Sequence, residues 1–471
     1  MNNSCRIAIL SLLSLLTTMS HSQTVRQVFG FSGAFASAED SATPAQGRDG
    51  RLYLTTNGSG STQNPDGTVF RIDANGADAA VLFSFSGTNG YLPTLAMTLG
   101  IDGDYYGTTL VGGAANSGVL FKVAPTGTYT ALYEFSGGTD GAFPIGSPVQ
   151  AADGNWYGAT ALGTGSTGTI YKYVPATGTF TTIFSLNADG SQGSGISAQI
   201  IQASDNSLYG TASTGGANNC GTIFRLTTAG VLLHVYSFPC GGGGFYPAGP
   251  LYEAADGSLY GTTEGGGNIT KGGPCNGNGC GTVFKVSNGV VSILYRFAGK
   301  PNDGAAPVAG FVLGTDGNLY AGTALGGSSN RGTLYQISAT GQYKLLYSFV
   351  DTLGSGAYGA LIQHTNGKFY GTAYWGGQYN EGSLYSLDMG LSPFIALVRY
   401  TGYVGRSVQI LGQGLKGATA VTVNGVPATS FKIVSDFYMT AVIPAGATSG
   451  PVVVTTSTGT LTSNHNLRIV K

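Results

Sequence analysis

A nine-residue pattern built around a tyrosine recurs seven times and constrains the fold more than any other feature of the chain. Successive tyrosines are 53, 51, 52, 51, 60 and 50 residues apart. They are Tyr53, Tyr106, Tyr157, Tyr209, Tyr260, Tyr320 and Tyr370. Self-similarity at a period of this length indicates a repeat architecture rather than a series of unrelated domains.

Each repeat contains four short segments typical of β-strands. The tyrosine segment, such as LYGTT at 259–263, is followed by a second segment, GTVF at 281–284, and a third, LYRF at 294–297. A fourth segment leads to the next tyrosine and closes with Asp-Gly, Asp-Asn or Asn-Gly, which supply the positive φ angles of tight hairpins. Aromatic and β-branched residues favour strands, and no helix is expected after the N-terminal leader.

Four strands per repeat predict the blade of a β-propeller, a ring that leaves only short, protected strand edges. Third segments lie between the tyrosine copies, but none follows GSLYSL at 382–387, whereas VFGF at 28–31 precedes the first copy. We therefore expect this N-terminal strand to complete the last blade. The prediction is an all-β chain with a seven-bladed β-propeller over residues 23–388. An open solenoid is the alternative, and it would need capping units.

The composition agrees with sheets that are buried on both faces. Only 9% of the residues are charged, 42% are hydrophobic, and 79 are Gly without a Gly-X-Y period. These values exclude intrinsic disorder and collagen. The net charge of −1, without runs of like charge, makes nucleic acid a poor candidate partner.

The N-terminus predicts export. Residues 1–6 carry one Arg, Ile7–Met19 is rich in Leu and Ile, and small residues around His21 precede a cleavage site expected after Ser22. An uncleaved anchor is the alternative reading of residues 1–22. No later segment is apolar for long enough to span a bilayer, so the mature chain is expected to be extracellular, cell-surface or periplasmic, and monomeric.

Four cysteines remain after the predicted cleavage, and an even number in an exported chain indicates disulfides. Cys220 precedes one strand segment and Cys240 follows the next, so a hairpin with a one-residue bulge brings them together. Cys275 and Cys280 are close enough in sequence to close a small loop. A zinc site is the alternative; otherwise neither a metal nor a cofactor is expected.

The repeat stops after Asp388, and residues 389–392 are predicted to form a linker. The remaining residues, 393–471, show a strand pattern of their own with an Asn424-Gly425 turn. The runs VQILGQGLKGATAVTVNGVPATSF and AVIPAGATSGPVVVTTSTG resemble an IPT/TIG domain. This resemblance implies a small immunoglobulin-like β-sandwich and carries no catalytic residues.

The repeats themselves resemble the GloVer family of tandem repeats from exported bacterial proteins. The resemblance rests on YGTT at 106 and 260 and on GTVFKV at 281, which recur in fixed order. It implies a secreted bacterial repeat protein, with surface association as one option, and no established activity.

Few side chains suit catalysis. The histidines His234, His364 and His465 occur in different contexts and are expected to be structural or solvent-facing. Most aspartates stand in predicted turns. Three aspartates stand in other loops instead and are candidate acids at the mouth of the ring. A carbohydrate-active hydrolase or lyase would need two such carboxyl groups close together. The three are Asp140, Asp189 and Asp303.

The second-to-third loops and the connections between repeats are expected to share one face of the ring. That face would present Tyr91, Phe143, Phe245, Tyr246, Glu264, Arg331, Tyr374, Trp375, Tyr379 and Glu381. Exposed aromatic rings with sparse charge suit stacking on sugars or docking a protein; the alternative is that the rings pack beneath their own loops. The hypothesis is an exported, non-enzymatic scaffold that binds a cell-surface polysaccharide or protein. The carbohydrate-active enzyme and a lectin-like glycan binder are the alternatives.

Overall fold

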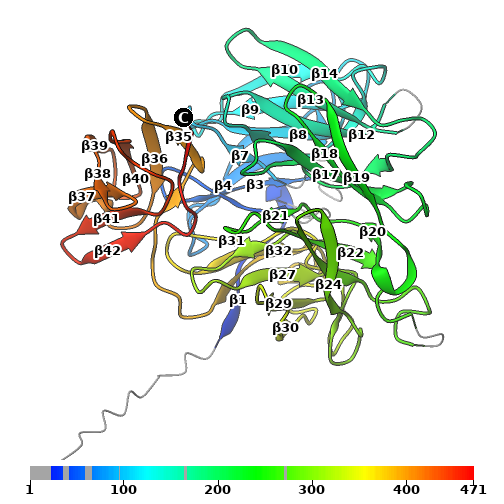
Figure 1. Ribbon diagram of the computed structural model, residues 1–471. Coiled ribbons are helices and arrows are strands. Elements are labelled where there is room, and N and C mark those ends of the chain that lie inside the picture. Colours follow the sequence, from blue (N-terminus) through cyan, green and yellow to red (C-terminus); the bar gives the residue numbers. More distant parts are fainter. Residues whose placement is uncertain are drawn as a thin grey trace, which may run out of the picture.

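The chain is almost entirely β-sheet in the computed structural model, which describes residues 23–35, 42–58, 66–94, 96–163, 167–269 and 273–470 (Figure 1). The helices among these residues are single 3-10 turns: η1 (Gly33–Phe35), η2 (Gly241–Gly243) and η3 (Leu415–Gly417). None of these described helices has the length and hydropathy needed to cross a membrane. The predicted signal peptide, residues 1–22, lies outside the described residues.

The described residues before Met389 form seven successive antiparallel sheets of four or five strands, one for each tyrosine repeat, which we call units one to seven, and the sixth unit also has a separate two-stranded pair of residues 304–305 with 325–326. Unit one contains β2 (Ala45–Gln46), β3 (Leu52–Thr56), β4 (Thr68–Ile72) and β5 (Ala80–Ser84), and unit two contains β6 (Tyr91–Pro93), β7 (Thr98–Leu99), β8 (Tyr105–Val111), β9 (Val119–Val123) and β10 (Tyr129–Glu134). Unit three contains β11 (Ala142–Gln150), β12 (Trp156–Leu162), β13 (Thr169–Val174) and β14 (Thr179–Ser185). Unit four contains β15 (Ser194–Ile196), β16 (Ile201–Gln202), β17 (Leu208–Thr214), β18 (Thr222–Leu226) and β19 (Leu232–Ser237).

The other three units have the same order of strands. Unit five contains β20 (Phe245–Pro247), β21 (Tyr252–Glu253), β22 (Leu259–Gly265), β23 (Thr282–Ser287) and β24 (Val290–Arg296). Unit six contains β25 (Gly304–Ala305), β26 (Val312–Leu313), β27 (Leu319–Thr323), β28 (Leu325–Gly326), β29 (Thr333–Ile337) and β30 (Tyr343–Ser348). Unit seven contains β31 (Ile362–Gln363), β32 (Phe369–Ala373) and β33 (Ser383–Asp388). The first strand of several units is split into two short pieces that pair with the same tyrosine strand.

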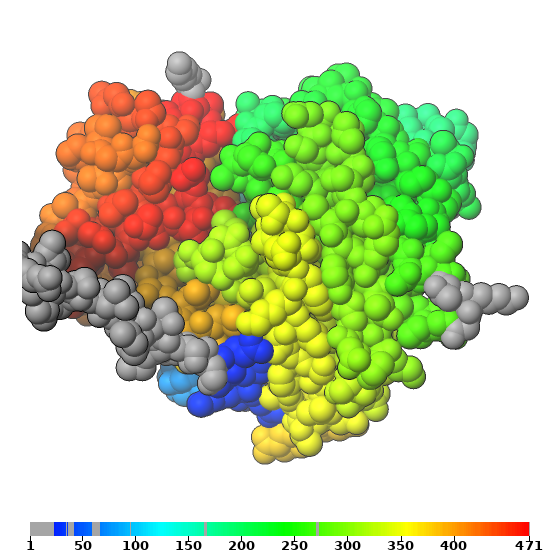
Figure 2. All heavy atoms as spheres, turned by 60° about the horizontal axis from the view of Figure 1, so that its bottom comes forward, coloured from blue at the N-terminus to red at the C-terminus, as the bar shows by residue number. Residues whose placement is uncertain are grey.

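The last sheet is completed by the N-terminal strand β1 (Thr24–Gly30). This strand runs antiparallel to β33, with Thr24 opposite Asp388 and Gly30 opposite Ser383, as the sequence predicted. In Figure 2 the dark-blue N-terminal residues lie against the yellow residues of unit seven. Phe31, which is buried, packs in one core with Leu52 of unit one and Tyr370 of unit seven. The two ends of the repeat region therefore pair in one sheet and share one hydrophobic core.

Polar side chains tie neighbouring units together at the hairpin turns. The backbone amide of Ala152 donates to the amide oxygen of Gln202 in the next unit at 2.7 Å, and Thr315 makes the same bond to Gln363 at 3.0 Å. Between units seven and one, the amide of Thr365 donates to Gln46 at 2.9 Å, and Gln46 donates back to the Thr365 hydroxyl. The seam that closes the chain is thus built like the seams between consecutive units.

The repeated tyrosine has two roles in this arrangement. In units one to four and in unit six its hydroxyl donates to the aspartate four residues earlier, as Tyr157 does to Asp153 at 2.8 Å, which stabilises the turn of its own hairpin. In unit seven the Tyr370 hydroxyl instead accepts a hydrogen bond from the Asn366 side chain. The ring of the repeated tyrosine packs on the next unit: Tyr106 stacks on Trp156 with centroids 3.9 Å apart, and Tyr157 shares a core with Leu208. The tyrosine therefore recurs because its ring packs between neighbouring units while its hydroxyl stabilises a hairpin turn.

Both predicted disulfides are present, Cys220–Cys240 and Cys275–Cys280. The first joins the two ends of the β18–β19 hairpin, and the second closes the insertion that lengthens unit five.

The C-terminal residues form two further four-stranded sheets around one core, seen in orange and red in Figure 1. One sheet has the order β34 (Ala396–Leu397), β36 (Ser407–Leu411), β40 (Tyr438–Val442) and β39 (Ser430–Ile433), and the other β38 (Val426–Pro427), β37 (Ala418–Val423), β41 (Val452–Thr456) and β42 (Gly459–Thr462). A parallel pair, β35 (Thr401–Tyr403) and β43 (Arg468–Val470), completes this C-terminal module. Its core is aliphatic, with Ile410, Val423 and Val454 fully buried.

The C-terminal module is held against the hairpin turns of the units. Arg468 donates to the Ser204 carbonyl and to the side-chain oxygen of Asn206. Tyr438 lies under the Arg48 guanidinium, whose carbon is 4.5 Å from the ring centroid. The segment just beyond the predicted linker also takes part, because the Phe394 amide donates to the Thr365 carbonyl at 3.1 Å. The module is therefore docked on the turn end of the sheets.

This contact is expected to weaken in acid. The His465 ring lies between Tyr400 and Tyr252, with centroids 4.4 and 6.1 Å away, and burial lowers its pKa to about 4. Between pH 6.5 and 4 the unfolded state binds a proton that the folded state rejects, so stability falls as pH falls, by up to about 3 kcal/mol. Thermal unfolding of the wild type and of His465→Phe at pH 7.5 and pH 5 measures this. The stability of His465→Phe relative to the wild type should be greater at pH 5 than at pH 7.5. A stability difference that does not depend on pH would contradict the assigned role of His465.

Candidate functional site

A cavity of about 340 Å³ lies where the first strands of all seven units meet. Corresponding segments of every unit line it: Thr43, Ala96, 145–146, 197–199, 246–250, Val308 with Gly310, and 358–360. Because equivalent residues of seven sheets surround one cavity, the sheets are arranged around a common axis, as in a propeller. We call this space the axial cavity. Most of its wall is Gly, Ala and Pro, so the first strands approach one another closely.

In units two to seven, two positions lie opposite each other across the first strand and the tyrosine strand, and three of these residues, Ser213, Tyr246 and Glu264, line the axial cavity. The two positions are fourteen residues before and four residues after the repeated tyrosine, and we call them rim pairs. The described rim pairs are Leu92 with Leu110, Phe143 with Ala161, Gly195 with Ser213, Tyr246 with Glu264, Ala306 with Ala324, and Gly356 with Tyr374.

The first residue of each described rim pair has a positive φ, even where it is not glycine. The angles are 56° for both Phe143 and Tyr246, a conformation that costs a bulky L-residue about 1 kcal/mol or more. A bond to the preceding unit enforces it: the Tyr246 amide donates to the Cys220 carbonyl at 3.1 Å, and the Phe143 amide donates to Ser117 at 3.0 Å. The rim is therefore a rigid ring whose side-chain chemistry changes from unit to unit.

Aromatic and polar groups concentrate on one side of the axial cavity. Tyr246, Glu264 and Tyr358 line it, with 43% of Tyr246 and 38% of Tyr358 exposed. Gln199 lines it as well. Burial raises the pKa of the Tyr358 phenol, and the negative charge of Glu264 raises it further. The carboxylate of unit five therefore acts on the phenol of unit seven across the mouth of the cavity.

The structure separates the predicted loop-face residues into groups. Tyr246 lines the axial cavity, and Phe143 and Tyr374 belong to rim pairs. Tyr91, Phe245 and Trp375 stand one position away from rim residues and do not line the axial cavity. The Phe245 ring meets the Tyr246 ring edge-on with centroids 4.9 Å apart, and the Trp375 ring meets the Tyr374 ring in the same way at 4.8 Å. Tyr379 lies in the last loop and is 52% exposed. Arg331 is paired with Asp351 at 2.8 Å, and Glu381 lies in a β-bridge with Gly376.

Sequence reasoning missed Tyr358 and Gln199. Each stands ten to twelve residues before a repeated tyrosine, in the interruption of the first strand. Aligning the seven repeats at these positions would have marked them as neighbours around the axis. The local sequence shows only a Gly-rich connection.

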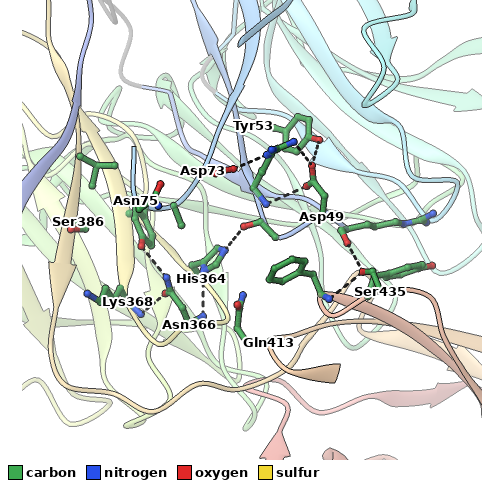
Figure 3. A pocket seen from close by; sticks show the side chains of 18 of the residues that line it. Asp49, Tyr53, Asp73, Asn75, His364, Asn366, Lys368, Ser386, Gln413 and Ser435 are labelled. Carbon is green, nitrogen blue, oxygen red and sulfur yellow. Dashed lines mark hydrogen bonds and ion pairs between the residues drawn. The ribbon is translucent and has the colours of Figure 1, made fainter. Parts of the chain in front are cut away.

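A larger cleft, of about 1120 Å³, lies between units one and seven and the C-terminal module (Figure 3). Most of its polar groups satisfy one another. Arg51 donates to Asp73 at 2.6 Å and also lies near Asp78 and Asp49. The His364 ring is hydrogen-bonded to the Gly50 carbonyl at 3.0 Å, and burial lowers its pKa. We interpret this cleft as the seam between the ring and the module.

The three candidate acids of the enzyme hypothesis line neither cavity. Burial opposes ionisation of Asp140, but hydrogen bonds from Ser136 and Tyr133 outweigh it and lower the pKa. Asp303 accepts bonds from the Tyr295 hydroxyl at 2.9 Å and from the Ala298 amide at 2.8 Å. Asp189 accepts from the Ser191 amide in an exposed turn. Each carboxylate thus holds its own loop.

The remaining candidates for chemistry are dispersed. His234 is exposed on β19, whereas His364 and His465 lie at contacts with other units or the module. Among the described residues, no three His, Cys, Asp or Glu side chains gather in a way that would hold a metal ion.

The model of the Gloeobacter/Verrucomicrobia repeat family matches residues 39–273 and 269–417, which include most of the seven units. No curated protein matches the chain.

Solved structures match at low identity. TolB from Acinetobacter baumannii is 17% identical with a TM-score of 0.38, over 63% of this chain and 62% of that one. The extracellular domain of BT4673 from B. thetaiotaomicron, assigned to a hybrid two-component system, is 10% identical with a TM-score of 0.47, over 92% of this chain and 57% of that one. A luciferin-regenerating enzyme is 9% identical with a TM-score of 0.38, over 79% and 97%. The chain thus spans about three-fifths of the length of the first two.

Proposed function

The chain belongs to the Gloeobacter/Verrucomicrobia repeat family, and we propose that it is an exported, non-enzymatic binding protein. In this proposal residues 23–388 form a seven-bladed β-propeller, and residues 393–471 form an immunoglobulin-like module of the IPT/TIG kind. The propeller binds a glycan of a cell surface at the rim of the axial cavity. Two disulfides support export, since disulfides persist in oxidising compartments.

The observation that carries the proposal is the asymmetric wall of the axial cavity. Tyr246 and Tyr358 expose ring surface beside the carboxylate of Glu264 and the side-chain amide of Gln199 in a concave site, which is the combination that sugar rings use. The volume, about 340 Å³, is within the range of small-ligand sites. Strand β20 holds Tyr246, and the Tyr358 ring packs against that of Tyr374 with centroids 5.2 Å apart, so both rings are held in place and little conformational entropy is lost on binding.

The candidate acids support binding rather than hydrolysis. A general acid for glycoside cleavage needs a raised pKa and a second carboxyl group nearby, whereas the Asp140 pKa is lowered. If the triple variant D140N/D189N/D303N abolished turnover of a polysaccharide while its thermal unfolding stayed cooperative, the enzyme alternative would replace this proposal.

A glycan array probed with the mature chain tests the proposal. A glycan that binds the wild type is expected to bind Tyr246→Ala and Tyr358→Ala at least about tenfold more weakly, because each removes a contact in the centre of the site. Trp375→Ala tests whether binding extends over the outer loop face. Tyr379→Ala, an exposed ring outside the cavity, is the matched control. Full binding by both axial variants would reject the site.

A further inference from the structure

The rim has a gap between two aromatic groups. In unit five, Tyr246 lies opposite Glu264 across β20 and β22, since Phe245 pairs with Gly265 and Pro247 with Thr263. In unit seven, the rings of Tyr358 and Tyr374 are 5.2 Å apart. The rim pair of unit six, which lies between them, consists of Ala306 and Ala324. Among the described residues of unit six, only Val308 and Gly310 line the axial cavity, and we call the part of the cavity between Tyr246 and Tyr358 the recess.

One negative charge faces this recess. Glu264 is the single charged side chain among the described residues that line the axial cavity, and no described residue forms an ion pair or hydrogen bond with its carboxylate. A neutral ligand seated over Glu264 would remove water from the carboxylate without replacing its hydrogen bonds, which is costly. An anionic ligand would be repelled. A cation satisfies the carboxylate and also gains from the faces of the phenol rings.

We propose that the recess formed by Tyr246, Glu264 and Tyr358 binds the protonated amine of an amino sugar, that is, a hexosamine without its N-acetyl group. The inference rests on the proposed glycan-binding function and specifies the class of sugar. Glu264 accepts hydrogen bonds from the ammonium group, while the phenol rings contact the ammonium and the apolar face of the sugar. N-acetylation removes the positive charge of the amine and therefore the preference of the recess for that sugar.

The test compares glucosamine oligomers with N-acetylglucosamine oligomers of equal length, by titration calorimetry on the mature chain at a pH where the amine is protonated. We expect the glucosamine oligomer to bind at least about tenfold more tightly, because a hydrogen bond to a charged group contributes more than a neutral one. Glu264→Gln should abolish this difference. The matched control is Asp189→Asn, which makes the same charge change in an exposed loop outside the cavity.

Each outcome decides the inference. Equal binding of the two oligomers, or a preference that survives in Glu264→Gln, overturns it; so does binding of neither oligomer. The inference is also overturned, in favour of a protein ligand, if a lysine-rich peptide binds in a Glu264-dependent manner and glucosamine does not bind. The proposed function fails separately, when no glycan of any charge shows binding that depends on Tyr246 and Tyr358. A neutral glycan with that dependence keeps the proposed function while the amine inference falls.

Discussion

Removing residues 23–31 is expected to lower the thermal stability of the protein by roughly 10 °C or more. The deletion takes β1 from the sheet of unit seven and removes Phe31, which is 1% exposed, from the core shared by units seven and one. Truncating one buried Phe costs about 3–5 kcal/mol, and one kcal/mol shifts the midpoint by about 2–4 °C in a domain of 150–250 residues. The unpaired edge of β33 adds to the loss.

Differential scanning calorimetry of the mature and shortened chains measures this effect. Phe31→Ala separates the loss of core from the loss of the strand, and it should account for part of the shift. Arg26→Ala, on the exposed side of the same strand, is the control and should change stability by less than about 0.5 kcal/mol. An unchanged midpoint after the deletion would mean that β1 does not close the ring.

Replacing Tyr157 should separate the two roles of the repeated tyrosine. Tyr157→Ala removes a fully buried ring from the seam between units three and four, and we expect a loss of about 3–5 kcal/mol. Tyr157→Phe keeps the ring and loses only the 2.8 Å bond to Asp153, so the expected loss is about 1 kcal/mol. Urea unfolding of the variants gives both values.

The control for this pair is Asp153→Ala, which removes the acceptor and leaves the ring in place. Its loss should exceed that of Tyr157→Phe, because Asp153 also accepts hydrogen bonds from the backbone and side-chain amides of Asn155. The double variant Tyr157→Phe/Asp153→Ala should cost less than the sum of the two. If Tyr157→Phe were as destabilising as Tyr157→Ala, the hydroxyl rather than the ring would hold the seam.

The repeat pattern made much of the fold predictable. Strand segments recur at a fixed distance from Tyr53 to Tyr370, so their order and pairing follow from local sequence. The missing third segment after residue 387 identified residues 28–31 as its replacement, and β1 pairs with β33 as expected. Both disulfides were predictable because Cys220 and Cys240 end one hairpin, while Cys275 and Cys280 are five residues apart.

The candidate site was predictable only in part. Tyr246 and Glu264 were expected in the loops of one face and lie on β20 and β22 beside the axial cavity, whereas Trp375 and Tyr91, which were grouped with them, do not line it. Sequence alone does not show which residues at a strand end face the axis. Asp140 and Asp303 looked available, whereas the structure shows their carboxylates bonded within their own loops. The docking of the C-terminal module depends on contacts between distant residues, such as Arg468 with Asn206, which no local pattern predicts.

The sequence by itself determined the repeating strand order, the closing strand and the cysteine pairs, because each depends on residues close together or on a pattern repeated seven times. The tertiary structure decided which side chains meet. Tyr358 and Glu264 are nearly a hundred residues apart, and His465 contacts Tyr252 across more than two hundred. Only closure of the ring and docking of the module bring such residues together, since no local pattern records a contact between distant units.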